Sequence, residues 1–136
     1  MPHFRIETNV PRSQIPATFV QKAVPVLAKA LGKPEQYCVV SIIPDVQMSF
    51  GGSTEPCAIA NLMSIGALGV EQNKKHAKVL FELCQILTLQ NSASLTTKPP
   101  RFNFSFDLEP RMYITFQDEP TGNVGFKGTT FHAIFG

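Results

Sequence analysis

The sequence of 136 residues lacks several features that define large classes of proteins. Its three cysteines, an odd number, do not make a disulfide framework, and no apolar run approaches the roughly 18 residues of a membrane span. The net charge is only +2, and no lysine and arginine cluster is interleaved with aromatic residues, so we expect no nucleic-acid partner. The first residues lack a charged segment followed by an apolar one, which argues against a classical signal peptide.

What remains is the composition of one folded domain. Hydrophobic residues make up 43% of the chain and charged residues 16%, which is typical of a globular protein. We therefore take residues 1–136 as a single domain, synthesised in a reducing cytosol. The three histidines, His3, His76 and His132, do not have the spacing of metal ligands, and we expect neither a metal nor another cofactor.

Hydrophobic periodicity predicts an α/β fold built from two β-α-β units. Phe4 and Ile6 alternate with polar neighbours, as in a half-buried strand, and a helical stripe covers residues 15–31 until Gly32 stops it. The other elements expected are strands at 37–43, 57–65 and 112–116, a second helix through 77–87, and a short hairpin or extra strand at 123–131. Pro25 lies inside the first helical pattern, where we expect a kink or a lost hydrogen bond.

Two right-handed crossover connections would put two antiparallel helices on one face of a four-stranded mixed sheet. The expected strands at 37–43 and 57–65 are apolar on both faces, which predicts that both of their faces are buried. A chain this short has no further element to cover the second face, so we expect another copy of the chain to cover it. The sequence thus predicts an oligomer without fixing the number of subunits.

The second residue, Pro2, is a candidate base. Removal of Met1 is favoured when a small residue follows, and it would leave Pro2 as the amino terminus, a secondary amine. An ordinary α-amino group has a pKa of about 8, which an apolar pocket and a nearby cation would lower. Such an amine could accept a proton near neutral pH. On this strand alone, the plainer interpretation of Pro2 as an ordinary second residue is the favoured one.

Short motifs follow one another in a fixed order along the chain. They are Met1-Pro2, Thr8-Asn9-Val10-Pro11, Leu31-Gly32-Lys33-Pro34, Phe50-Gly51-Gly52-Ser53, Glu55-Pro56-Cys57-Ala58, Ser64-Ile65-Gly66, Arg111-Met112-Tyr113-Ile114 and Gly128-Thr129-Thr130-Phe131. Together they resemble the macrophage migration inhibitory factor and D-dopachrome tautomerase family, over roughly residues 1–83 and 109–132. Pro56-Cys57 and the sequence around Ile65 resemble the first branch of that family more than the second.

The resemblance implies a tautomerase fold that assembles as a homotrimer, with an active site at each subunit interface. It implies a keto–enol tautomerase acting on small aromatic keto acids, of the phenylpyruvate and dopachrome type. Members of the family are also cytokines, so the resemblance implies a cell-surface receptor as a partner. They are cytoplasmic and are secreted by a non-classical route, and we expect the same locations here, without insertion into a membrane.

Carried over by position, the resemblance gives individual residues a role. Pro2 matches the catalytic base, and Lys33 matches the cation that lowers the pKa of that base and binds the substrate carboxylate. Ile65 matches a residue whose backbone N–H holds the substrate, and Tyr113 matches a tyrosine lent by the neighbouring subunit. The apolar residues that match the rim around the substrate ring are Val124, Phe126 and Phe131. Without the resemblance, Lys33 would be interpreted as a solvated lysine after a helix end, Ile65 as the last apolar residue of a strand, and Tyr113 as a core or interface residue.

Two positions depart from the family pattern. Thr115 stands where members often have asparagine, and the shorter side chain without an amide would shift substrate preference or turnover. Ala60 stands where some members have the second cysteine of a Cys-x-x-Cys motif, so thiol–disulfide exchange is not expected. We interpret Cys57, Cys38 and Cys84 as small buried residues.

An atypical inserted segment at about 84–108 does not fit the resemblance. Residues 91–100 are polar and rich in breakers, which predicts a loop or disorder, and the alternation at 102–108 predicts an added edge strand. We expect the segment to replace the end of the second helix. It is either a real insertion used for binding or the product of a variant transcript or gene-model error. The alternative function is therefore a catalytically impaired cytokine-like ligand, or a splice variant whose insertion disrupts the trimer and the active site.

Overall fold

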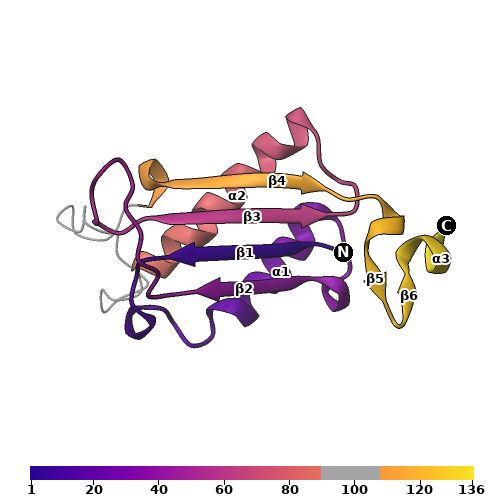
Figure 1. Cartoon of the computed structure of the whole chain (residues 1–136), viewed down its shortest axis with the longest axis horizontal. Helices are drawn as coiled ribbons and strands as arrows, with labels where there is room; N and C mark the ends of the chain where they lie inside the picture. The colour runs from indigo at the N-terminus through magenta and orange to yellow at the C-terminus, as the bar shows by residue number, and fades with distance from the viewer. Residues whose placement is uncertain (90–107) are drawn as a thin grey trace.

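The computed structural model describes residues 1–89 and 108–136. Its main elements are strands β1 (His3–Thr8), β2 (Val39–Ile43), β3 (Ala58–Ser64) and β4 (Met112–Asp118), and helices α1 (Phe19–Leu31) and α2 (Val70–Leu89). The strand order is β2-β1-β3-β4, with β2 parallel to β1, β4 parallel to β3, and β1 antiparallel to β3. Figure 1 shows both helices behind one face of this sheet, which confirms the predicted mixed sheet of two β-α-β units.

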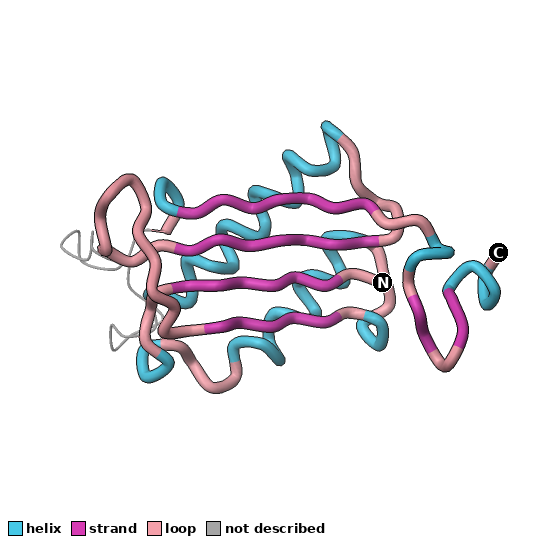
Figure 2. The backbone as a smooth tube through the Cα atoms, in the orientation of Figure 1, coloured by secondary structure: helices cyan, strands magenta, loops and turns pink. Residues whose placement is uncertain are grey.

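A small second unit follows β4 at one end of the sheet. It consists of the 3-10 turn η5 (Thr121–Asn123), the two-residue strands β5 (Gly125–Phe126) and β6 (Thr129–Thr130), and the five-residue helix α3 (Phe131–Phe135). The pairing of β5 with β6 confirms the expected hairpin, whereas α3 was not anticipated from the sequence. Figure 2 shows this unit projecting beyond the sheet at the end where the N-terminus lies. Further 3-10 turns among the described residues lie at Arg12–Gln14 (η1), Glu35–Tyr37 (η2) and Glu109–Arg111 (η4).

The strand register divides the sheet into two faces. Phe4 pairs with Val40 in β2 and with Leu62 in β3, so these side chains all point to the face that the helices cover. There they form the core with Leu27 of α1 and Leu80 of α2, which have no exposed surface. We call the opposite side the open face, and its side chains are His3, Arg5, Glu7, Val39, Ser41, Ile43, Ile59, Asn61, Met63, Tyr113, Thr115 and Gln117.

The prediction that the strand at 37–43 is buried on both faces is wrong for the single chain. β2 is an edge strand, and Val39 and Ile43 on its open face are 44% and 39% exposed. β3 lies inside the sheet, yet Ile59 on its open face is exposed as well. The physical reason is that both helices lie on the other side. The apolar pattern is real, but no helix or strand among the described residues, 1–89 and 108–136, covers it.

Helix α1 begins later than its apolar spacing predicts, because Ile15 is not helical. The φ and ψ angles of Ile15, −100° and 126°, are those of an extended residue. Pro16 favours this conformation in the residue before it. Ile15 packs against the core all the same, so it extends the apolar pattern without extending the helix. The predicted stop is confirmed, since Gly32 has a left-handed φ of 64°. Pro25 is accommodated on the exposed side of α1.

Helix α2 continues through residues 84–89, so the prediction that the inserted segment replaces the end of this helix is wrong. The loop expected at 91–100 lies outside the described residues, as does the predicted edge strand except for its last residue. That residue, Leu108, is buried in the core just before β4. From there, β4 pairs with β3 over seven residues, from Met112 opposite Ala58 to Asp118 opposite Ser64.

Candidate active site

Three segments meet at the end of the sheet where β1 begins and β3 ends. Pro2 is buried there, and its carbonyl oxygen accepts a hydrogen bond of 2.9 Å from the backbone N–H of Val39. Lys33 directly follows the glycine that ends α1, and its Nζ donates a 2.9 Å hydrogen bond to the carbonyl oxygen of Ile65, just beyond β3. The structure thus brings together three of the predicted site residues, which come from separate parts of the sequence.

The electrostatic surroundings favour an amine without its proton at this end of the sheet. Burial lowers the pKa of the α-amino group of Met1 below 8.0, and the Lys33 ammonium lowers this pKa further. Cys38 acts in the opposite direction and raises this pKa. An unprotonated amine held beside an ammonium group can accept a proton while the ammonium binds an anion.

Cys38 differs from its prediction as a buried residue, since its side chain is half-buried. Its Sγ donates a 3.4 Å hydrogen bond to the carbonyl oxygen of Pro34. Burial raises the pKa of the Cys38 thiol, the amino terminus lowers it, and Glu35 raises it. The reason for the exposure is that Cys38 precedes β2, which is the edge strand of the sheet that the described residues form.

Aromatic side chains form a wall beside this end of the sheet. The rings of Phe126 and Phe131 are stacked with centroids 5.1 Å apart, and Phe131 N–H donates to the carbonyl oxygen of the buried Val124 at 3.0 Å. Tyr37 meets both rings edge-on, at 5.7 Å and 6.0 Å. Because Tyr37 lies two residues before Val39, the partner of Pro2, it joins the aromatic wall to the amine end of the site.

Sequence reasoning missed Tyr37 as a site residue and assigned it only to an apolar strand. The signal that could have found it is the parallel pairing of β2 with β1, which starts with Val39 opposite His3. This pairing brings the residues just before both strands to one end of the sheet. Tyr37 and Pro2 are therefore close in space, although 35 positions separate them in the numbering.

Tyr113 is the one predicted site residue that the chain does not bring to Pro2. It lies opposite Ile59, which in turn lies opposite Glu7, five residues along β1 from Pro2. At about 3.3 Å a residue, this places Tyr113 roughly 16 Å away along the sheet. Its side chain is 66% exposed on the open face. Tyr113 can therefore contribute only to a site that includes Pro2 of another copy of the chain.

A loop held by hydrogen bonds from Arg111 supports Tyr113 at its end of the sheet. The ring of Phe50 lies 5.1 Å from the ring of Tyr113, and the Arg111 guanidinium lies 5.4 Å above the same Phe50 ring. Arg111 also donates hydrogen bonds to backbone carbonyl oxygens of the loop, at Phe50, Ser53, Glu55 and Pro56. This arginine thus fixes the loop against which Tyr113 rests.

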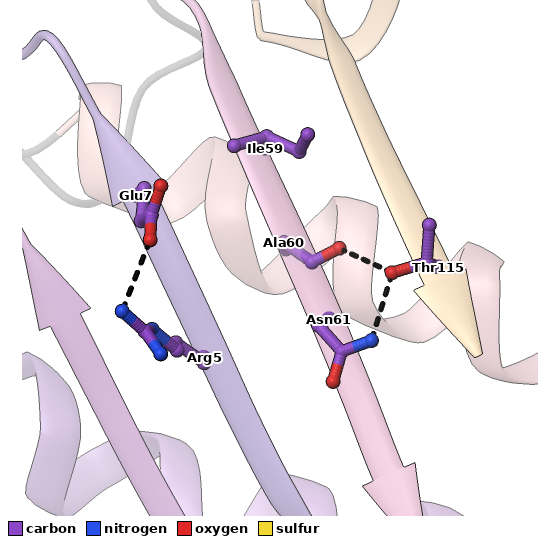
Figure 3. Close-up of a pocket in the computed structure, with 6 residues that line it drawn as sticks. All are labelled: Arg5, Glu7, Ile59, Ala60, Asn61 and Thr115. Carbon is purple, nitrogen blue, oxygen red and sulfur yellow. Dashed lines mark hydrogen bonds and ion pairs between the residues drawn. The ribbon is translucent and has the colours of Figure 1, made fainter. Parts of the chain in front are cut away.

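The middle of the open face carries a pocket lined by Arg5, Glu7, Ile59, Ala60, Asn61 and Thr115 (Figure 3). Arg5 and Glu7 form an ion pair of 3.1 Å in it. Beside them, Asn61 donates a 2.8 Å hydrogen bond to the Thr115 hydroxyl, which donates to the carbonyl oxygen of Ala60 at 3.4 Å. Thr115, the departure from the family pattern, is thus tied to its own chain rather than extended away from the sheet.

The remaining cysteines and the histidines have structural surroundings. Cys57 and Cys84 are buried as predicted, none of the chain's three cysteines is in a disulfide, and burial raises the pKa of Cys84 to about 12. His76 is buried and donates from Nε2 to the carbonyl oxygen of Ala67 at 2.8 Å.

In the described ranges 1–89 and 108–136, no cluster of three or more His, Cys, Asp or Glu could hold a metal ion, and no helix is long and apolar enough to cross a membrane.

Comparison with known proteins identifies the relatives of this arrangement. The profile of the family "Macrophage migration inhibitory factor (MIF)" matches residues 1–97. Macrophage migration inhibitory factor of Xenopus laevis is 42% identical over 131 residues, covering 96% of this chain and 99% of the relative. The homolog of Brugia malayi is 37% identical over the same coverage.

Solved structures agree with the sequence comparison. The structure of macrophage migration inhibitory factor from Trichinella spiralis matches with a TM-score of 0.75 and 32% identity, covering 94% of this chain and 98% of that one. The homologue from Prochlorococcus marinus matches with a TM-score of 0.74 and 28% identity, covering 95% and 98%. On both sequence and fold, this chain belongs to the macrophage migration inhibitory factor family.

Proposed function

We propose that this chain is a keto–enol tautomerase in which Pro2, freed by removal of Met1, is the base. The observation that carries the proposal is that partial burial, and next the Lys33 ammonium, lower the pKa of the α-amino group of Met1 at this end of the sheet, where the amine of Pro2 would stand after Met1 is removed. The substrates we propose are aromatic 2-keto acids of the phenylpyruvate type and dopachrome-like carboxylates. The family relationship supports a tautomerase and cytokine-like role in general terms.

The proposed reaction moves one proton within the substrate. The Pro2 nitrogen accepts a proton from the CH₂ carbon next to the keto group, and the electron pair of the broken C–H bond forms the carbon–carbon double bond. The carbonyl oxygen, which gains the electrons of its π bond, is protonated to the enol. Because the proton lost from carbon is balanced by one gained at oxygen, no co-reactant is consumed.

Lys33 is suited to hold the substrate carboxylate during this transfer. Its ammonium group has three N–H donors and uses one of them on the carbonyl oxygen of Ile65, which leaves two for an anion. The backbone N–H of Ile65 is the proposed donor to the substrate on the same side. Val124, Phe126 and Phe131 would receive the substrate's ring on their apolar surfaces.

We further propose that the functional assembly is a homotrimer. The separation of Tyr113 from Pro2 of its own chain calls for a neighbouring copy, and the family relationship supports three subunits. The open face, with its exposed Val39, Ile43, Ile59 and Tyr113, is the surface that a neighbouring copy would cover. In such an assembly, Tyr113 of one subunit would complete the site that begins at Pro2 of the next. Light scattering on the purified protein measures the mass of the assembly. The mass of three subunits is expected, and the mass of a single chain would contradict the homotrimer.

The test of the base is the Pro2→Gly variant, which keeps a small second residue so that Met1 is still removed. The variant replaces the ring-held secondary amine of proline by the primary amine of glycine, which weakens and misplaces the base without deleting it. General-base catalysis contributes about 10²- to 10⁴-fold to rate, so we expect a loss of kcat/KM for phenylpyruvate of up to that size. Intact-mass measurement establishes the N-terminus of each sample. A Pro2→Gly enzyme with wild-type kcat/KM would refute the proposal.

The test of the anion site is Lys33→Gln, with Lys29→Gln in the last turn of the same helix as its matched control. We expect a raised KM for phenylpyruvate, because the carboxylate loses its cationic partner. We also expect the acid limb of the pH profile of kcat/KM to move to higher pH, because the pKa of the amine rises without the Lys33 charge. Equal kinetics for the two variants would refute this role.

A second function from a different class is a secreted, cytokine-like ligand that binds a cell-surface receptor without turnover. The family relationship favours this role, and it can coexist with catalysis. Receptor binding that persists in a Pro2→Gly variant without tautomerase activity would separate the two functions. The intact pairing of β4 with β3 weighs against the version in which the inserted segment shifts β4 and so disables the site.

A further inference from the structure

The short helix α3 adds a third phenylalanine to the aromatic wall. The Phe135 ring is stacked on the Phe131 ring, with centroids 5.7 Å apart and planes inclined by 21°. It also meets the Tyr37 ring edge-on at 6.3 Å. Phe135 therefore contacts two residues of the candidate site, although it was not singled out from the sequence.

The position of Phe135 decides which part of the wall a ligand can reach. Phe126 and Phe135 are both stacked with Phe131, while Tyr37 packs edge-on, and Phe131 is left with only 4% of its surface exposed. An incoming aromatic ring therefore cannot stack on Phe131 while these neighbours stay in place. By contrast, Phe135 itself is 62% exposed.

Phe135 is the neighbour that can leave most easily. Phe126 lies in the paired strand β5, whereas Phe135 lies in the last turn of a helix of five residues. That helix is closed by the Gly136 N–H bonded to the His132 carbonyl at 2.8 Å and capped by the Thr130 hydroxyl, which accepts from Ala133 N–H at 3.3 Å. An exposed ring at the end of such a short element has few contacts to lose.

We propose that Phe135 is an intramolecular competitor for the aromatic wall and thereby determines substrate specificity. An aryl ligand must displace the Phe135 ring from Phe131 before it can stack there. This inference rests on the proposed function, since it assigns the same site an aromatic ligand. The Phe135 ring makes the affinity for an aryl acid weaker than the aromatic wall would give without it. The affinity for aliphatic 2-keto acids, which do not need the stacking surface, is unaffected.

Removal of the ring gives the decisive variant, Phe135→Ala. Ring pairs of this kind contribute an energy equivalent to about two- to tenfold in a binding constant, so we expect KM for phenylpyruvate to fall by that factor. We expect kcat to stay unchanged, and KM for an aliphatic 2-keto acid to stay unchanged. Phe135→Tyr, which keeps the ring, should retain the wild-type KM.

The matched control is Ile134→Ala, which shortens an exposed apolar side chain of the same helix. It should leave KM for phenylpyruvate unchanged, so a general loosening of α3 is distinguished from loss of the ring. A KM that rises in Phe135→Ala would show that Phe135 attracts the substrate, and an unchanged KM would show that it does not compete. Either result overturns the proposal.

Binding of phenylacetate, an aryl carboxylate that we use as a probe without a keto group, separates this inference from the proposed catalysis. Titrations followed by NMR should give a Kd about two- to tenfold lower for Phe135→Ala than for the wild type. If no variant turns over phenylpyruvate but this difference in Kd is found, the tautomerase proposal fails and the competition stands. Equal Kd values, or no binding to any variant, would overturn the competition.

Discussion

The two faces of the sheet differ in what covers them. On the helix-covered face, Phe4, Leu62 and Leu80 have no exposed surface. On the open face, β3 and β4 carry Ile59 and Tyr113, which are large, apolar and exposed. Burial of apolar side chains is the main favourable term in folding, and only one face of the isolated chain gains it fully. The other face is suited to gain it on association.

The open face is not uniformly apolar, and this matters for what can bind there. The Arg5–Glu7 ion pair and the Asn61–Thr115 hydrogen bond lie among the apolar side chains (Figure 3). Polar groups of this kind can be buried under a partner only where their hydrogen bonds and ion pairs are kept or replaced. The helix-covered face thus stabilises the fold of the single subunit. The open face would determine how neighbouring subunits are arranged.

The largest effect is expected from truncation on the helix-covered face. Leu62→Ala removes a fully buried side chain and leaves a cavity, so we expect unfolding free energy to fall by about 2–5 kcal/mol. The matched truncation on the open face of the same strand is Ile59→Ala. Urea unfolding at several protein concentrations compares the two variants. A loss of stability within the subunit does not depend on protein concentration, whereas a loss of stability from weakened assembly does. Concentration-dependent loss in Leu62→Ala would contradict this distinction.

A charge on the open face should break assembly without unfolding the subunit. Ile59→Lys places an ammonium group on this face beside Glu7, its register neighbour, so the single chain can accommodate it. We expect a folded monomer by light scattering and circular dichroism, with phenylpyruvate turnover lost because Tyr113 no longer reaches a neighbour's Pro2. Ile59→Leu is the control. A Lys variant that keeps the wild-type mass would show that another surface mediates assembly.

The two faces also differ in how well their structure could be predicted from the sequence. Alternation around Phe4 and Ile6 predicted β1, and Gly32 predicted the end of α1, because these signals are local. The apolar residues of β2 were correctly seen on both sides, but a pattern cannot say whether its own chain covers them. The start of α1 was misplaced because Ile15 packs in the core from an extended conformation.

The candidate site was predictable only through the family motifs. Lys33 and Ile65 are hydrogen-bonded across 32 residues of sequence, and no periodicity brings two such residues together. Tyr37 and Phe135 went unnoticed since each acts through ring contacts that arise from the β1–β2 pairing and from α3. Tertiary contacts of this kind become visible only when the strand order and the C-terminal unit are known.

A smaller effect should distinguish two buried hydroxyls on the helix-covered face. Thr8 Oγ1 donates to the Cys57 carbonyl at 2.7 Å and accepts from Val10 N–H at 3.1 Å, whereas Ser64 Oγ has no hydrogen-bond partner among the described residues. We expect Thr8→Val to lower the unfolding free energy by about 1–3 kcal/mol, because it leaves two buried backbone groups unpaired. Ser64→Ala should leave it unchanged or raise it by up to about 1 kcal/mol. Thermal unfolding of both variants measures this, and a strongly destabilised Ser64→Ala would mean that its hydroxyl is bonded in solution.

The smallest effect concerns pH and the open face. Burial lowers the pKa of His3 below 6.5 and the Arg5 charge lowers it further, while His3 Nε2 and Ser41 Oγ are hydrogen-bonded at 2.9 Å. The unfolded chain therefore binds a proton at His3 more readily than the folded chain. The contribution of His3 to stability is fully present above pH 6.5 and is lost as the pH falls through the lowered pKa. Melting temperatures between pH 5 and 8 should thus fall less steeply on acidification in His3→Gln than in the wild type, with His132→Gln on α3 as the control. Equal slopes for His3→Gln and the wild type would mean that the open face does not disfavour the charged imidazole, and that a neighbouring subunit or solvent compensates the charge there.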